Sequence, residues 1–197
     1  MKNYLNTVNL NRNIWFLFLC YNLIGDYMKQ IITNKHNLKD EDITEVVKRV
    51  KVLLVNSNNE ILLANSNHEY QFPGGHVEDG EELIDTVNRE ITEETGLVLN
   101  AKDIEPFACS IGYWKDWPEE GKNRKTEIYY FEVKTDLKPD LNHLNLTDKE
   151  KEGNFHLEYL PLENIEEIIT SNASIYEDKH GIAKEMLELF SIYKKGE

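Results

Sequence analysis

Hydrophobic positions follow two different patterns along the chain. The first pattern, two short apolar runs separated by a polar turn, predicts a β-hairpin. Residues 49–55 (RVKVLLV) and 60–64 (EILLA) are rich in aliphatic and β-branched side chains, which favour strands. Residues 56–59 (NSNN) lie between them and are turn formers. Two strands joined by so short a polar turn are expected to pair antiparallel.

The second pattern is helical and begins at residue 81. Its apolar positions recur at steps of three or four: Leu83, Ile84, Val87 and Ile91. No Gly or Pro interrupts residues 81–95, and Gly96 follows as a left-handed cap, so we predict an amphipathic helix that ends there. Residues 71–81 (QFPGGHVEDGE) contain paired glycines, a proline and acids. This composition predicts a structured loop before the helix.

The rest of the chain predicts further strands and helices with polar loops between them. Strands are expected near residues 106–113, 126–134 and 155–160, with loops at 114–125 and 138–154. Helices are expected from 161 to about 170 and from about 179 to 194. The last helix has one apolar side: Ile182, Met186, Leu189, Phe190 and Tyr193. Since no repeat or linker divides residues 28–197, we predict a single mixed α/β domain there.

Residues 1–27 are a doubtful N-terminal extension. Their apolar run at residues 14–24 is about 11 residues long, whereas a membrane span needs roughly 20. A signal-peptide core of this length is the alternative, but no small-residue cleavage site follows it. Gly25 to Met28 can be encoded by a purine-rich ribosome-binding sequence followed by ATG. We therefore predict that translation begins at Met28.

The charge of the chain narrows its partners. It has 22 Lys and Arg against 36 Asp and Glu, a net charge of −14, which repels nucleic-acid polymers. Small phosphorylated ligands remain compatible, because a divalent cation reverses the local sign of charge. Cys20 and Cys109 form no CxxC pair, which favours a reduced, cytoplasmic setting. No membrane partner is expected.

Three glutamates on the predicted helix carry the candidate chemistry. Glu90, Glu93 and Glu94 are spaced i, i+3 and i+4, so their carboxylates share one helical face. Clustered carboxylates are the ligands that hard cations such as Mg²⁺ prefer. Arg89 can hold Glu81 or Glu93 through a fork-like ion pair. A merely solvated acidic face is the alternative for the glutamates alone.

The spacing of the whole segment weighs against that alternative. Residues 75–97 (GHVEDGEELIDTVNREITEETGL) fit the pattern Gx5Ex7REUxEExGU, where U is aliphatic. Its fixed positions are Gly75, Glu81, Arg89, Glu90, Glu93, Glu94 and Gly96. Seven fixed residues, each at roughly 7% usage, coincide by chance about once in 10⁸ starts. This pattern is the Nudix box, and over about residues 45–195 the chain resembles the Nudix hydrolase family.

The resemblance implies a fold, an activity and a set of site residues. The fold is an α/β/α sandwich on a mixed β-sheet, with the box forming a loop–helix–loop. The activity is Mg²⁺- or Mn²⁺-dependent hydrolysis of the pyrophosphate linkage in a nucleoside diphosphate attached to another group X. Glu90, Glu93 and Glu94 correspond to metal ligands, with the Gly75 carbonyl as a further candidate. The other two box residues, Arg89 and Glu81, correspond to residues that orient the ligand helix.

The general base and the substrate stay open. In the family the base is a box glutamate, here Glu93, or a glutamate from a loop before the last strand. Residues 147–154 (TDKEKEGN) occupy that loop, with Glu152 and then Glu150 as candidates, and plain solvation is the alternative.

Substrate contacts are expected after the box. Some relatives that act on diadenosine polyphosphates carry a tyrosine about 16–18 residues beyond it, and Tyr113 lies 16 residues after Leu97. Some ADP-ribose hydrolases carry a proline near position 112, which is glycine here. Tyr113, Trp114 or Trp117 are candidates for stacking on a base, with simple packing as the alternative.

Three functions follow from these observations. The first is a pyrophosphohydrolase of small nucleotide-derived substrates, with no nucleic-acid polymer as partner. The second is a non-catalytic, nucleotide-sensing Nudix-like module, and the third is isomerisation on the same scaffold with Cys109 as the reactive residue. Glu94→Gln discriminates between the first two, because it should abolish hydrolysis and spare part of ligand sensing. Since many relatives pair through N-terminal strands, a homodimer is the assembly to test.

Overall fold

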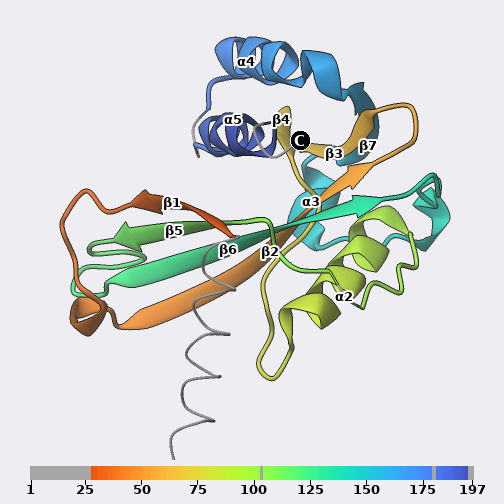
Figure 1. Cartoon of the computed structure of the whole chain (residues 1–197). Coiled ribbons are helices and arrows are strands. Elements are labelled where there is room, and N and C mark those ends of the chain that lie inside the picture. The colour runs from red at the N-terminus through yellow and green to blue at the C-terminus, as the bar shows by residue number, and fades with distance from the viewer. Residues whose placement is uncertain (1–27, 103, 179–180, 195–197) are drawn as a thin grey trace, which may run out of the picture.

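The computed structural model describes residues 28–102, 104–178 and 181–194, so the expectations for residues 1–27 lie outside the described residues. Seven strands form one sheet (Figure 1). In chain order they are β1 Lys29–Thr33, β2 Glu45–Val55, β3 Glu60–Ser66, β4 Glu69–Gln71, β5 Ala108–Trp114, β6 Arg124–Lys134 and β7 His156–Pro161. This agrees with the strand runs in the sequence, apart from two short additions.

The sheet is mixed. Its order is β1-β5-β6-β2-β3-β4, and β7 pairs with β3. The β1–β5 and β2–β6 pairs are parallel, whereas β2–β3, β3–β4, β3–β7 and β5–β6 are antiparallel. The expected hairpin is confirmed, because Leu54 pairs with Leu62 and Val55 with Ile61 across the turn.

Helices cover the two faces of the sheet. They are α2 Leu83–Thr95, α3 Asp148–Glu152, α4 Ile165–Tyr176 and α5 Ile182–Tyr193, with short 3-10 turns η1 Asp40–Asp42, η2 Leu141–His143 and η3 Leu162–Asn164. Figure 1 shows α4 and α5 above the sheet and α2 below it. Among the described residues, no helix is long and apolar enough to cross a bilayer.

Strand β2 supplies both hydrophobic cores, because its side chains alternate between the two faces. Leu53 and Val55 pack in the core below α4 and α5, with Phe190 among their neighbours. Val50 and Val52 pack in the core against α2. One sheet with a helix layer on each face is the α/β/α sandwich that the sequence predicts.

The differences from the sequence prediction lie where local patterns are short. Strands β1 and β4 have only five and three residues. β1 pairs with the distant strand β5, whereas β4 folds back on β3 in a tight hairpin. The helix expected from residue 81 begins at Leu83, because Glu82 has an extended backbone conformation. The expected loop at 138–154 contains η2 and α3.

Candidate active site

The glycine-rich segment before α2, residues 72–77, lies along the free edge of β2. Val52 N–H donates to the Pro73 carbonyl at 2.9 Å, Val50 N–H to the Gly75 carbonyl at 3.0 Å, and Val77 N–H to the Lys48 carbonyl at 3.0 Å. We call this segment the glycine loop. Gly74 has φ +134°, and a Cβ there would overlap the Val50 carbonyl. Only glycine therefore brings the loop this close to β2.

Arg89 joins the acidic residues of the box. Its Nε and Nη2 atoms donate to the two Glu81 carboxylate oxygens at 2.8 and 2.9 Å. Its Nη1 atom donates to Glu90 at 2.8 Å and to Glu93 at 3.3 Å. Nη2 also reaches the His76 carbonyl at 2.9 Å. One guanidinium thus connects three carboxylates with the glycine loop, and the expected fork-like ion pair is present on Glu81.

Glu81 is fully engaged in this network. Besides Arg89, it accepts hydrogen bonds from Glu78 N–H at 3.0 Å and from the Thr86 hydroxyl at 2.8 Å. The Arg89 hydrogen bond is the main cause that lowers the pKa of Glu81 to about 2. Glu81 is therefore a permanent anion that holds Arg89 in place, which suits a positioning residue.

The side chains of Glu90 and Glu94 extend from α2 to the glycine loop. A Cβ on Gly75 would overlap the Glu90 carboxylate, so the glycine leaves the space in which that carboxylate lies. Glu94 is buried and accepts a hydrogen bond from Gly74 N–H at 3.0 Å. Burial raises the pKa of Glu90, although Arg89 opposes this shift. Both carboxylates are thus fixed beside the loop.

Glu93 is held by a segment far away in sequence. The Asn145 side chain donates to the Glu93 carboxylate at 3.3 Å, and Asn145 N–H donates to the Glu93 carbonyl at 2.8 Å. Sequence reasoning missed Asn145, because its polar loop has no local signal for this contact. Glu93 keeps 32% of its side-chain surface exposed, more than Glu90 at 12%.

Two basic residues of β2, Lys51 and Arg49, were not identified from the sequence as neighbours of the glycine loop. Lys51 Nζ donates to the Phe72 and Gly74 carbonyls at 2.8 and 3.1 Å, and burial lowers its pKa. Arg49 Nε donates to His76 Nε2 at 3.2 Å. Burial is the main cause that lowers the pKa of His76, and the charge of Arg49 lowers it further. Alternation along β2 could have placed both cations on one face, but not beside the glycine loop.

The donor set of the box fits a hard divalent cation in its chemistry. Glu90, Glu93 and Glu94 offer only oxygen atoms, and Gly75 leaves room for the Glu90 carboxylate. The Gly75 carbonyl accepts one hydrogen bond from Val50, and a carbonyl oxygen has a second lone pair. Within the described part of the chain, no three acidic, His or Cys side chains are arranged as a metal cage. Arg89 instead lies between the Glu90 and Glu93 carboxylates.

The other candidates lie apart from this cluster. Glu152 is exposed at the end of α3, and no contact among the described residues joins it to the carboxylates of α2. The Tyr113 hydroxyl donates to Asp40 at 3.0 Å, and Lys125 Nζ lies 5.5 Å from the centre of its ring. Trp114 is 43% exposed. Its indole Nε1 lies 2.6 Å from the position that a Cβ would take on Gly112.

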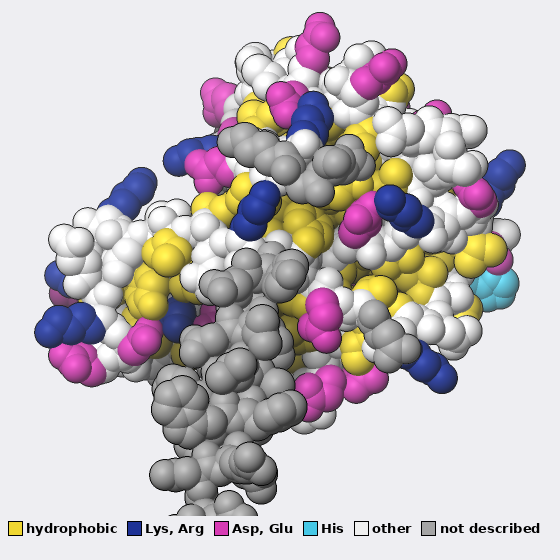
Figure 2. Space-filling view, viewed as in Figure 1, with side chains coloured by type: hydrophobic (Ala, Val, Ile, Leu, Met, Phe, Trp, Pro, Cys, Tyr) yellow, Lys and Arg dark blue, Asp and Glu magenta, His cyan; other side chains and the backbone are white. Residues whose placement is uncertain are grey.

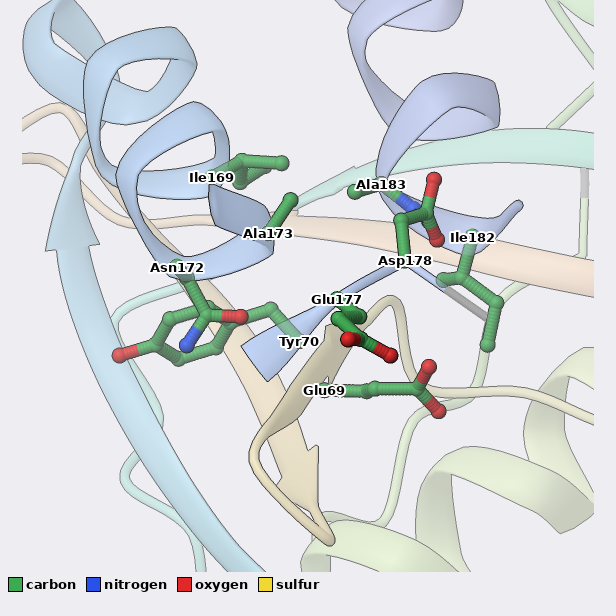
Figure 3. Close-up of a pocket in the computed structure, with 9 residues that line it drawn as sticks. All are labelled: Glu69, Tyr70, Ile169, Asn172, Ala173, Glu177, Asp178, Ile182 and Ala183. Carbon is green, nitrogen blue, oxygen red and sulfur yellow. Dashed lines mark hydrogen bonds between the residues drawn. The ribbon is translucent and has the colours of Figure 1, made fainter. Parts of the chain in front are cut away.

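A small cavity between β4, α4 and α5 is separate from the box (Figure 3). It encloses about 10 Å³, room for one water molecule. Its acidic side chains include Asp178, which accepts hydrogen bonds from the N–H groups of Ala183 and Lys184 at 3.1 Å each. The Asp178 carboxylate thus satisfies two N–H groups in the first turn of α5, and the cavity is too small for a nucleotide.

Several solved structures are similar to this chain at low sequence identity. A MutT protein from Methanosarcina mazei Go1 is 20% identical, with a TM-score of 0.50, over 77% of this chain and 96% of that chain. An Ap4A hydrolase from C. elegans is 18% identical, with a TM-score of 0.48, over 76% and 96%. A MutT structure from work on Aliivibrio salmonicida and Vibrio cholerae is 16% identical, with a TM-score of 0.45, over 73% and 94%.

Family membership rests on a model of the sequence family. The model of the NUDIX domain matches residues 46–179, about two thirds of the chain, and these residues include the whole box. None of the curated proteins matches the chain. The matched residues, the sheet order and the carboxylates around Arg89 lead to one assignment. The chain belongs to the NUDIX domain family.

Proposed function

We propose that this protein is a Mg²⁺-dependent hydrolase of the pyrophosphate linkage in a nucleoside diphosphate attached to a group X. Membership of the family makes the chain a Nudix pyrophosphohydrolase, and the metal and the nucleotide are the parts proposed here. The observation that carries the proposal is the network of Arg89, which joins Glu81, Glu90 and Glu93 beside the glycine loop.

The metal would be held by box oxygens. Glu90, Glu93 and Glu94 are the proposed ligands, with the Gly75 carbonyl as a further one, and Mn²⁺ would suit the same donors. A bound divalent cation supplies positive charge to the phosphate oxygens and makes water easier to deprotonate. Arg89 and Glu81 keep the glutamates in register with the loop. Glu81 contributes through Arg89 and is thus a positioning residue.

The chain's own groups then move the proton. We assign Glu93 as the general base, because its side chain is the most exposed of the three box glutamates. Its carboxylate is therefore the one that water can reach. Its carboxylate would accept the proton of the attacking water, while Asn145 fixes its orientation. Glu152, in the loop before the last strand, is the second candidate for the base.

The partner would be small. The net charge of −14 disfavours nucleic-acid polymers, and side chains of both signs are interspersed over the face seen in Figure 2. A nucleotide-derived substrate needs only a local positive field. We further propose a cytoplasmic protein in which residues 28–197 act as one domain, a setting compatible with the free, buried thiol of Cys109.

A homodimer is proposed through the β1 side of the sheet. Ile32 and Val46 are 62% and 52% exposed, and the strand register places them on the same face of the sheet. These two exposed apolar side chains lie on the same face of the sheet, with β5 and β6 between their strands. Light scattering on the purified protein should give twice the chain mass, and Ile32→Asp should shift it to one chain. A wild-type monomer would contradict the dimer.

The proposed reaction is tested with protein that begins at Met28. It is incubated with Mg²⁺ and a panel of nucleotide sugars, dinucleoside polyphosphates and nucleoside triphosphates, and the products are separated by chromatography. We expect a nucleoside monophosphate and a phosphorylated partner, with no turnover in Glu94→Gln or in EDTA. Glutamine retains an acceptor for Gly74 N–H, so this variant should fold. Ligand-induced thermal stabilisation without turnover would instead support the nucleotide-sensing alternative.

A further inference from the structure

The strand register sorts the aromatic and basic side chains around the box onto two faces of the sheet. Residues that pair across neighbouring strands project to the same face. Arg49 pairs with Ile128, and Ile128 pairs with Ser110. Trp114 pairs with Arg124 and lies two same-face positions beyond Ser110. Arg49, Arg124 and Trp114 therefore share one face.

Tyr113 is on the opposite face. It pairs with Lys125, and its hydroxyl and ring contact Asp40 and Lys125. The face of Arg49 also carries His76 of the glycine loop, because these two residues form an antiparallel bridge and a side-chain contact. Of the two neighbouring aromatic residues, Trp114 thus lies on the face that carries Arg49 and meets the glycine loop at His76, whereas α2 packs on the opposite face against Val50 and Val52.

The part of this face near Trp114 lies away from the helix layers. Figure 1 shows β5, β6 and the first half of β2 extending to the left beyond α2, α4 and α5. Trp114 lies back over Gly112, where the missing side chain makes room for the indole. The indole is thus laid against the sheet while 43% of the residue stays exposed. An aromatic ring held in this way is suited to stacking.

We propose that this face is the nucleoside subsite of the enzyme, with Trp114 stacking on the base and Arg49 binding a phosphate oxygen. The inference rests on the proposed pyrophosphatase function and specifies how its substrate binds. Gly112 and Arg49 are separated by two strand spacings and two residue steps, a diagonal of roughly 12 Å. This separation suits a base at one end and a phosphate at the other, with the pyrophosphate directed to the glycine loop beside Glu90.

The charges on this face favour a phosphate at Arg49. The Nη2 and Nε atoms of Arg49 lie 2.9 and 3.2 Å from His76 Nε2. His76 is a neutral partner when this nitrogen accepts the hydrogen bond. Arg124 is paired with Glu45 at 2.8 Å, so its charge is locally offset. Glu185 of α5 accepts a hydrogen bond from Tyr130 at 2.6 Å and limits the positive field on that side. Lys51, on the same face, already donates to the carbonyls of Phe72 and Gly74. Arg49 is therefore the cation of this face that we assign to phosphate.

The test uses a probe that this enzyme cannot cleave. AMP carries a base and one phosphate but no pyrophosphate bond, and ribose 5-phosphate lacks the base. Titration calorimetry of both should show tighter binding of AMP by about tenfold to a hundredfold, the usual size of a base–aromatic stack. Trp114→Ala should remove this preference, and Trp114→Phe should keep most of it.

Three further variants separate the contributions of the base and the phosphate to binding. Tyr176→Ala removes an aromatic residue of similar exposure, 45%, on α4, and should leave AMP binding unchanged. Arg49→Ala should weaken AMP and ribose 5-phosphate by similar factors, and Arg49→Lys should restore part of the loss for both. Circular dichroism of each variant checks the fold.

The outcomes distinguish the proposed nucleoside subsite from the proposed hydrolase activity. Equal affinity of wild type and Trp114→Ala for AMP, or failure of AMP to bind wild type, would overturn the nucleoside subsite whatever the hydrolysis assays give. If AMP binds as expected but no substrate is cleaved, the subsite stands and the hydrolase fails. In an active enzyme, Trp114→Ala should raise KM about tenfold or more and change kcat little.

Discussion

Removal of the Glu81 charge should destabilise the fold in a way that depends on pH. Glu81 accepts two hydrogen bonds from Arg89, and its side chain is 19% exposed. Its pKa falls from 4.5 to about 2. At about 1.36 kcal/mol for each pKa unit, this shift has an upper value of ~3 kcal/mol. Solvent screening reduces it, so we expect Glu81→Gln to lower the free energy of unfolding by ~1–2 kcal/mol at pH 7.

The sign of the pH effect follows from the lowered pKa. A carboxyl group with a depressed pKa in the folded state contributes stability above its unfolded pKa, and loses it as pH falls from 4.5 towards 2. Urea unfolding in EDTA at pH 7, 5, 4 and 3 should therefore show a gap between wild type and Glu81→Gln that narrows below pH 4.5. Thr86→Val removes a neutral hydrogen-bond donor to the Glu81 carboxylate, so it should give a smaller gap that narrows over the same pH range. A constant or absent gap for Glu81→Gln would refute the assigned ion pair.

Four other predictions cover the loop, the cores, the thiol and the metal. Gly74→Ala should lower the melting temperature by several degrees, because its Cβ would meet the Val50 carbonyl; an unchanged value would contradict the loop geometry. Ile91→Ala should cost about 2–5 kcal/mol in urea unfolding, since Ile91 is fully buried. Burial raises the pKa of Cys109 to about 11, so native protein at pH 8 should react with iodoacetamide far more slowly than unfolded protein, and stability should fall as pH rises from about 9 to 11. EDTA should abolish turnover and added Mg²⁺ should restore it, whereas activity in EDTA would contradict the metal-dependent reaction.

The helix and hairpin around the box could be predicted from sequence because their signals are local. The stripe of Val87 and Ile91 faces one core, and Gly96 has the left-handed φ of 69° expected of a cap. The sequence left Glu81 and Glu93 open as partners of Arg89, and the structure shows contacts with both. Each of these features needs only residues that are close in the chain.

The remaining parts of the site depend on contacts between distant segments. Asn145 reaches Glu93 from 52 residues away, and Arg49 meets His76 only because the glycine loop lies along β2. The opposite faces of Tyr113 and Trp114 follow from the register of β5 and β6. A strand prediction without register cannot supply these facts, because a shift of one residue reverses the face of every side chain.

The most direct test of the central claim is the rate of nucleotide pyrophosphate hydrolysis in wild type and Glu94→Gln, side by side at saturating Mg²⁺. Glutamine keeps the acceptor for Gly74 N–H but removes one anionic ligand, so equal melting temperatures would show that both proteins fold. We predict release of a nucleoside monophosphate by wild type and a rate at least a hundredfold lower in Glu94→Gln. Equal rates in the two proteins would contradict a reaction that depends on the box carboxylates.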